Sequence, residues 1–308
     1  GPCFAANGIY PLFLTWKTGP GETLRNIVQD WSRKVFGDDE ALAGSLASEL
    51  GEMRDRAIEV TARLFGRGVW SEMRENAACG QQPGHGLDQV AQQLAALQAR
   101  AQAAGRPLEI HLIGHSAGSI LLGHLLERWL QPDLRARAPS LAGVTLYAAA
   151  CSMRFAVARY LRAVDEGLLT IEQIRLCHLS DRNEKADALP TPALQAYGKS
   201  LLYLVSRALD DERKQPLLGM ERALLPEYAS RKSEQWAREE LESVRTWQRR
   251  WPASAGTVIT EPTVRTTQRG DRIAATHGSF DNNIDLIGET LERIRCAPLV
   301  APLERLDY

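Results

Sequence analysis

Short apolar runs alternate with amphipathic segments along this chain, and this alternation limits the fold more than any other feature does. Expected strands occupy residues 9–16, 108–113, 143–150 and 174–180, and a weaker pair occupies residues 256–261 and 272–277. Apolar strands that alternate with amphipathic helices are typical of a mostly parallel sheet covered by helices on both faces. The sequence therefore predicts an α/β fold.

The expected helices follow from apolar residues that recur every three or four positions. One long stripe consists of Leu42, Leu46, Leu50, Met53, Ala57, Val60 and Leu64. A second helix runs from Gly86 to Gly105 and stops before Pro107, a third covers 120–130, and a closing helix begins near Ile284. The charged stretch 207–256 is interpreted as solvated helices rather than as a linker.

The 308 residues fit one domain, because a chain of this length can bury a single large core. We expect a single domain over 1–308, with helical insertions at about 21–104 and 188–250. No internal repeat or low-complexity tract divides it.

Charge and composition exclude several classes of protein. The 37 lysines and arginines nearly cancel the 38 aspartates and glutamates, so nothing indicates a nucleic-acid partner. The apolar runs are too short to span a bilayer, and the start shows no signal-peptide pattern. The five cysteines are scattered without a CxxC pair, which argues against a disulfide scaffold or a zinc site. A cytoplasmic protein fits best.

The stretch IHLIGHSAGS carries the most specific chemical signal. The expected strand runs into Gly114, Ser116 and Gly118, and a helix follows. A serine on so tight a turn stands exposed at the carboxyl end of the sheet, and glycines two positions away on either side avoid collisions. The Ala117 amide would point to where an oxyanion forms, at the start of the helix. The alternative is a glycine-rich turn whose serines cap the helix.

An activated serine needs a base, and the base needs an acid that orients it. Asp181 directly follows the strand 174–180, and His277 ends the segment 272–277, before the closing helix. Because ligands bind at the carboxyl ends of parallel strands, all three residues are expected at one edge of the sheet.

With these residues the chain resembles serine hydrolases of the α/β-hydrolase superfamily, of an esterase- or lipase-like and poorly characterised bacterial type. The resemblance covers roughly residues 9–295, and the order serine, acid, histidine agrees with it. The stretch YGKSLLYLVSRALDDERKQPLLGM (197–220) is also similar to such proteins, without a role attached to it.

Other residues compete for these roles. Glu184 and Asp187 share the stretch SDRNEKAD with Asp181, which is favoured because it is closest to the strand end; Asp187 is the alternative acid. His111 and His178 are interpreted as core histidines and His115 as packing beside the turn, and a His111/His115 metal pair lacks helical spacing. Cys151 is interpreted as a buried, inert thiol. No metal or cofactor is implied.

The front of the chain departs from the family pattern. A second oxyanion donor usually comes from a loop after an early strand, and no such loop is visible before residue 9. The early strands are therefore expected to be missing; the opening Gly1-Pro2 resembles a protease scar. Gly8 or the backbone near Trp16, Lys17 and Thr18 could substitute as donor. A second copy of the chain or an upstream fragment could complete the sheet.

The resemblance implies a serine hydrolase that cleaves a carboxylic ester or a related acyl bond of a small molecule through an acyl-enzyme. Two alternatives stay open. The chain could be a weak or inactive hydrolase fold that serves as an interaction module, or a peptidase or acyltransferase, because one fold hosts many reactions.

Overall fold

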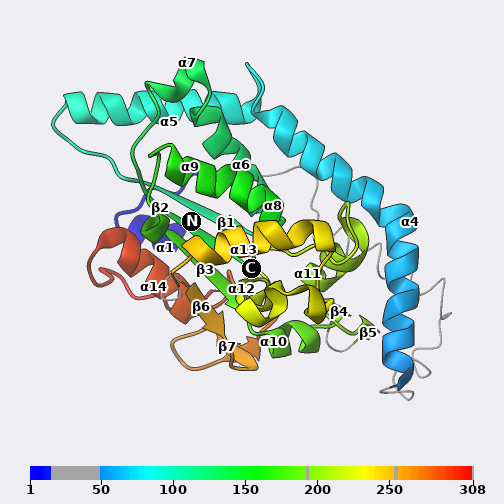
Figure 1. Cartoon of the computed structure of the whole chain (residues 1–308). Helices are drawn as coiled ribbons and strands as arrows, with labels where there is room; N and C mark the ends of the chain where they lie inside the picture. The colour runs from blue at the N-terminus through cyan, green and yellow to red at the C-terminus, as the bar shows by residue number, and fades with distance from the viewer. Residues whose placement is uncertain (15–48, 192–193, 253–255, 307–308) are drawn as a thin grey trace.

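The computed structural model describes residues 1–14, 49–191, 194–252 and 256–306. Its centre is a sheet of four parallel strands in the order β1-β2-β3-β6 (Figure 1). These are β1 (Ile110–His115), β2 (Leu141–Tyr147), β3 (Ile174–Leu179) and β6 (Gly256–Ile259). Register pairs Gly114 with Leu146, and Leu146 with Leu176, so the strands end at a common edge. The expected α/β fold with a parallel sheet is confirmed.

Helices cover both faces of this sheet (Figure 1). One face of the sheet carries side chains that are all buried: Val144, Leu146, Ile174 and Leu176. The other face of the sheet is covered by α14 (Ile284–Arg295). There the Tyr147 hydroxyl lies 2.6 Å from the Thr290 hydroxyl, and Arg175 forms an ion pair with Glu289. α6 (Gly118–Trp129) packs against β1 and against the helical run 153–165.

The remaining elements surround this centre. The helices are α1 (Pro2–Ala6), α4 (Glu49–Gly80), α5 (Gly86–Ala103), α7 (Pro132–Arg135), α8 (Met153–Ala156), α9 (Arg162–Asp165), α10 (Asp181–Ala186), α11 (Leu201–Leu204), α12 (Glu221–Leu224) and α13 (Leu241–Arg250). π-Helical turns join α8 to α9 at Val157–Leu161 and extend α11 at Val205–Leu209. Two antiparallel ribbons pair β4 (Leu189–Thr191) with β5 (Leu194–Tyr197), and β7 (Thr263–Arg265) with β8 (Arg272–Ala274).

The strand expected over 9–16 is wrong for the part that the structure describes. Residues 9–14 form no strand, and Tyr10, Leu12 and Phe13 are each more than half exposed. Pro11 removes a backbone donor from the middle of this run, which disfavours a paired strand. Residues 15 and 16 lie outside the described residues. The apolar composition of the run was therefore not enough to make it a strand.

Only one of the two weak strands at the end of the chain joins the parallel sheet. β6 pairs with β3, as expected for 256–261. β8, the segment expected as a strand over 272–277, pairs instead with β7 in a separate antiparallel ribbon. A connection of a few residues allows a hairpin, whereas a parallel crossover needs a dozen residues or more. His277 thus lies beyond a hairpin rather than at the end of a sheet strand.

The long helix α4 buries a different face from the one that its leucines suggest. An apolar stripe normally faces the core, yet Met53, Val60 and Leu64 are all more than half exposed. Leu42 and Leu46 lie outside the described residues. The buried face carries Ile58, Ala62, Trp70, Met73, Ala77 and two acidic residues, Asp55 and Glu59. Among the described helices, none is long and apolar enough to cross a bilayer.

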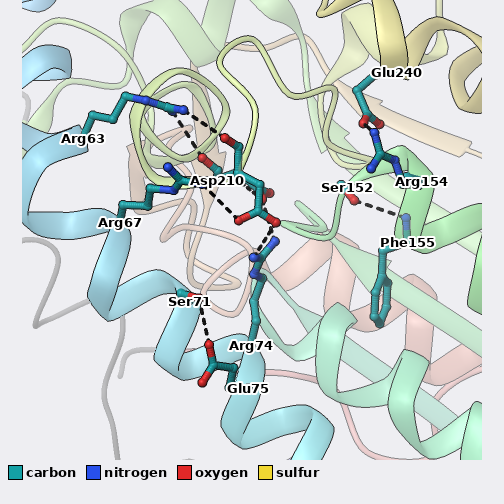
Figure 2. Close-up of polar contacts among 11 residues, drawn as sticks. Arg63, Arg67, Ser71, Arg74, Glu75, Ser152, Arg154, Phe155, Asp210 and Glu240 are labelled. Atoms are coloured by element: carbon teal, nitrogen blue, oxygen red, sulfur yellow. Dashed lines mark hydrogen bonds and ion pairs between the residues drawn. The ribbon is translucent and has the colours of Figure 1, made fainter.

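The segment 197–213 supplies polar partners to this face of α4. The Gly198 amide donates to Asp55 at 2.8 Å, and the Tyr197 hydroxyl donates to Glu59 at 3.0 Å. Further along, Arg74 binds the carboxylates of Asp210 and Asp211 at 2.7 Å each, while Arg63 reaches the carbonyls of the same two residues (Figure 2). Buried acids need such partners, because an uncompensated buried charge is costly.

The end of the same stretch, 217–220, packs against the loop that follows β2. The Leu218 amide donates to Cys151 at 2.9 Å, and the Gly219 amide donates to Ala149 at 2.8 Å. A Cβ at Gly219 would lie 2.3 Å from the Ala149 nitrogen, so only glycine lets the two backbones approach this closely. The stretch 197–220, which sequence left without a role, thus joins α4 to the loop after β2.

We expect Gly219→Ala to destabilise the fold by about 1–3 kcal/mol or more, because the added Cβ overlaps backbone that cannot rotate away. Gly68→Ala in α4 is the matched control. A Cβ there meets no described atom within 4 Å, so this change should stabilise the helix by about 0.5–1 kcal/mol. Urea unfolding of the two variants measures both signs. Equal stability of Gly219→Ala and the parent chain would contradict the close backbone approach.

Candidate active site

Ser116 occupies a strained turn between β1 and α6. Its φ is 53°, in the left-handed region that side chains other than those of glycine, asparagine and aspartate rarely adopt. Its amide donates to the Tyr147 carbonyl at 2.9 Å, which continues the β1–β2 ladder by one residue. Ala117 then takes helical dihedrals at the N-cap of α6. The turn leaves the Ser116 side chain partly exposed at the carboxyl end of the sheet.

The two glycines of the motif, Gly114 and Gly118, differ in how closely other atoms approach them. A Cβ at Gly114 would lie 2.9 Å from Leu122 and 3.1 Å from the Gly118 backbone, so the expected collision is present there. A Cβ at Gly118 would meet no described atom within 4 Å. The expectation that both glycines avoid collisions is therefore right for Gly114 and wrong for Gly118.

His277 is fixed by both its ring and its main chain. Its Nε2 lies 2.9 Å from Ser116 Oγ. Its amide donates to Asp187 Oδ2 at 2.6 Å, and its carbonyl lies 2.9 Å from His115 Nε2. His277 is buried, with 7% of its surface exposed, so these contacts are shielded from water. The structure thus brings together the serine and the histidine that the sequence proposed.

Asp187 follows α10 directly and lies beside His277. It caps the carboxyl end of this helix, where its amide donates to the Asn183 carbonyl at 2.9 Å. It is 5% exposed. A carboxylate has about four acceptor positions, so Oδ2 can hold the His277 amide while the group accepts a further donor. Of the acids in SDRNEKAD, Asp187 is the one whose carboxylate binds His277.

The structure does not bring Asp181, the acid favoured from sequence, to His277. Its carboxylate binds Lys185 at 2.7 Å, Arg222 at 2.9 Å and the Tyr203 hydroxyl. Burial opposes ionisation here, but the hydrogen bonds from Lys185 and Tyr203 and the charge of Arg222 outweigh it and hold the pKa of Asp181 below its usual value. The correction has a simple cause: α10 separates the two acids, because Asp181 begins this helix and Asp187, which lies next to His277, follows its end.

Glu184, the third acid of this stretch, is a buried carboxyl. It is 1% exposed, it accepts from the Ser200 hydroxyl, and its Oε1 has no hydrogen-bond partner among the described residues. Burial raises its pKa to about 8, and the nearby charges of Asp187, Asp181 and Glu221 act in the same direction. Glu184 is therefore neutral at pH 7, whereas Asp181 is ionised. The sequence offered no signal for this difference.

The carbonyl of Ser116 is fixed by the start of α6 and by the loop that follows β2. It accepts from the Ala150 amide at 3.1 Å, from the Ser119 amide at 3.1 Å and from the Ser119 hydroxyl at 2.7 Å. The Cys151 amide donates to that hydroxyl at 3.1 Å. The Cys151 thiol itself is buried, and burial raises its pKa to about 12, as an inert thiol requires.

Gly8, the one suggested second oxyanion donor that the structure describes, does not lie at this edge of the sheet. Next to Gly8, the Asn7 carbonyl accepts from Arg295, at the end of α14. The neighbouring Arg293 contacts Glu172, which precedes β3. Gly8 is therefore at the amino end of the strands, opposite Ser116. Trp16, Lys17 and Thr18 lie outside the described residues.

His178 and His111, both interpreted from sequence as core histidines, lie in β3 and β1. His178 is buried in β3, and its Nδ1 lies 3.0 Å from the carbonyl oxygen of the next residue, Leu179. His111 is partly buried and lies 3.4 Å from Glu109. In the described parts of the chain, no group of three or more histidine, cysteine or acidic side chains could hold a metal ion. The chain matches no protein-family model, no curated protein and no solved structure.

The raised pKa of Glu184 predicts how stability depends on pH. Above about pH 4.5 the unfolded chain releases this proton while the native protein keeps it up to about pH 8, so stability falls as pH rises through that interval. The free energy of unfolding should decrease by up to about 1.4 kcal/mol per pH unit from this group, a few kcal/mol in all. Glu184→Gln should remove this slope.

The measurement is urea unfolding of the parent and of Glu184→Gln at pH values between about 5 and 8. Asp181→Asn is the control. The pKa of Asp181 is lowered, so its stabilising contribution disappears only as pH falls through more acidic values, and the slope above pH 5 should persist in this variant. A slope that persists in Glu184→Gln would show that Glu184 is ionised in the native protein.

Proposed function

We propose that this chain is a serine hydrolase of the α/β-hydrolase type that cleaves a carboxylic ester or a related acyl bond of a small molecule. In this proposal Ser116 is the nucleophile, His277 is the general base and Asp187 orients the base. One observation carries it: the Ser116 hydroxyl lies 2.9 Å from His277 Nε2 on a residue held at a φ of 53°. Backbone strain of this kind concentrates at functional sites.

The reaction would begin with proton transfer from Ser116 Oγ to His277 Nε2 as the oxygen attacks the acyl carbonyl. The Ala117 amide, at the N-cap of α6, would donate to the oxyanion that forms. His277 then gives the proton to the leaving group, which departs as an alcohol. Water, activated by the same imidazole, would release the acid and restore the serine.

Asp187 would act on the imidazole from the side opposite Ser116. Because its carboxylate already holds the His277 amide, a hydrogen bond to Nδ1–H would fix the tautomer with a free Nε2 lone pair and stabilise the imidazolium that forms. The neutral state of Glu184 supports this role, since a second ionised carboxyl nearby would favour protonation of Asp187.

The same observations favour an enzyme over a non-catalytic interaction module. A binding surface requires neither a left-handed serine nor a histidine at hydrogen-bond distance from it. A panel of ester, peptide and acyl-acceptor substrates distinguishes these three chemistries. The five cysteines lie in the described residues and form no disulfide, which supports our further proposal of a cytoplasmic location.

Ser116→Ala should abolish labelling by a fluorophosphonate probe and reduce ester hydrolysis by about 10⁶-fold, the size seen when a triad nucleophile is lost. Peptide mapping should find the probe on Ser116 of the parent chain. Ser152→Ala is the control serine: it caps α8 by accepting from the Phe155 amide at 3.1 Å, so its loss should leave labelling intact (Figure 2). Labelling of Ser116→Ala at the parent rate would exclude the serine mechanism.

Asp187→Asn should lower turnover by roughly 10⁴-fold, because an amide cannot hold the imidazole in the required tautomer. Asp181→Asn should change turnover by less than about tenfold, since its contacts fix the start of α10 and carry about the energy of ordinary hydrogen bonds. Steady-state turnover per probe-reactive Ser116 compares the two. The reverse ranking would return the orienting role to Asp181.

A further inference from the structure

His115 binds the main chain of the proposed base. It is the residue immediately before Ser116 at the end of β1, and its Nε2 lies 2.9 Å from the His277 carbonyl oxygen. A carbonyl oxygen only accepts, so Nε2 must carry a proton and donate it. The strand end that presents the nucleophile therefore also holds the backbone of the base.

The His115 ring also contacts the loop that carries His277. Its centroid lies 5.2 Å from that of His277 and 5.7 Å from that of Phe280. Phe280 in turn stacks on Tyr147 at 6.0 Å, at the end of the neighbouring strand β2. Phe280 and Tyr147 are buried, so this row of rings leaves the loop little room to shift relative to the strand ends.

The surroundings keep His115 neutral. Burial lowers its pKa, and this effect outweighs the charge of Asp281 and the contact with the His277 carbonyl, which act in the opposite direction. The groups that face it are His277, Phe280 and Asp281. A neutral ring can donate one hydrogen bond without placing a positive charge next to an imidazole that must itself become positive.

We propose that His115 is a positioning residue that sets the distance between Ser116 and His277 by donating from Nε2 to the His277 carbonyl. The inference rests on the proposed function, because it assumes that His277 is the base. Asp187 holds the amide of His277 and His115 holds its carbonyl, so the base is fixed on both sides of its Cα. Such placement matters because a misplacement of about 1 Å can cost about 100-fold in rate.

Two variants of His115 separate the hydrogen bond from the packing. His115→Phe keeps a ring against His277 and Phe280 but removes the donor. His115→Gln keeps an amide N–H donor at a similar distance from the backbone but removes the ring. We expect kcat to fall about tenfold in His115→Phe, with KM within about twofold, and to stay within about threefold of the parent in His115→Gln.

The rates are measured per probe-reactive Ser116, so that a variant that folds poorly lowers the number of sites and not the rate of each. The pH profile of kcat/KM supplies the second readout. We expect the acidic limb, which reports His277, to keep its midpoint in His115→Phe while the plateau drops. A purely structural role would lower the number of reactive sites and leave the plateau per site unchanged.

Three results would overturn the inference. An unchanged plateau per site in His115→Phe would show that the hydrogen bond does not position the base. Loss of the acidic limb in that variant would show that His115 itself titrates as the base. Absence of probe labelling in the parent chain would overturn the proposed function, and this inference with it, whereas the first two results leave Ser116 as a nucleophile.

Discussion

The left-handed backbone at Ser116 is the constraint on which the rest of the site depends. A conformation of this kind costs about 1–3 kcal/mol and persists only where neighbours determine it fully. Here the amide is held by β2, and the carbonyl accepts from Ser119 and Ala150. The loop that provides Ala150 is itself supported by Gly219, and the stretch before Gly219 is bound to α4. Contacts far from the serine along the sequence thus stabilise its strained turn.

Three acids within seven residues take different states because α10 points them into different surroundings. Asp181 lies at the start of the helix among cations, which keep it ionised. Glu184, one turn later, faces the interior, where burial keeps it neutral. Asp187, at the end, reaches the main chain of His277. The three acids therefore differ through their surroundings and not through their residue type: one forms a structural ion pair, one is a buried neutral acid, and one is the proposed orienting acid. Burial and neighbouring charges set the pKa of each carboxyl group.

Sequence patterns predicted the parallel sheet and the turn at Ser116, because both depend on local periodicity and on short apolar strands. His277 lies near Ser116 as expected, but it follows a hairpin and not a strand of the parallel sheet. The sequence patterns gave wrong predictions where the direction of a side chain decides its contacts. Proximity to the strand end selected Asp181, but the first turn of α10 carries that side chain towards Arg222 and leaves Asp187 beside His277. In the described part of α4, Met53, Val60 and Leu64 are exposed. The buried face includes Asp55 and Glu59 instead, whose partners are about 140 residues away in sequence. A single sequence does not show such pairings.

The proposed base, His277, is held in position in the absence of substrate, and this lowers the cost of ordering it during a reaction. A flexible histidine loop would have to be ordered during the reaction, and that cost would appear in the barrier. Here the amide and the carbonyl of His277 are both engaged, and its ring already meets Ser116 Oγ. The partners in the two main-chain contacts stand at the ends of regular elements: His115, which donates, ends β1, and Asp187, which accepts, follows α10 directly. Preorganised polar groups need little rearrangement as charge develops, which is the main source of electrostatic catalysis.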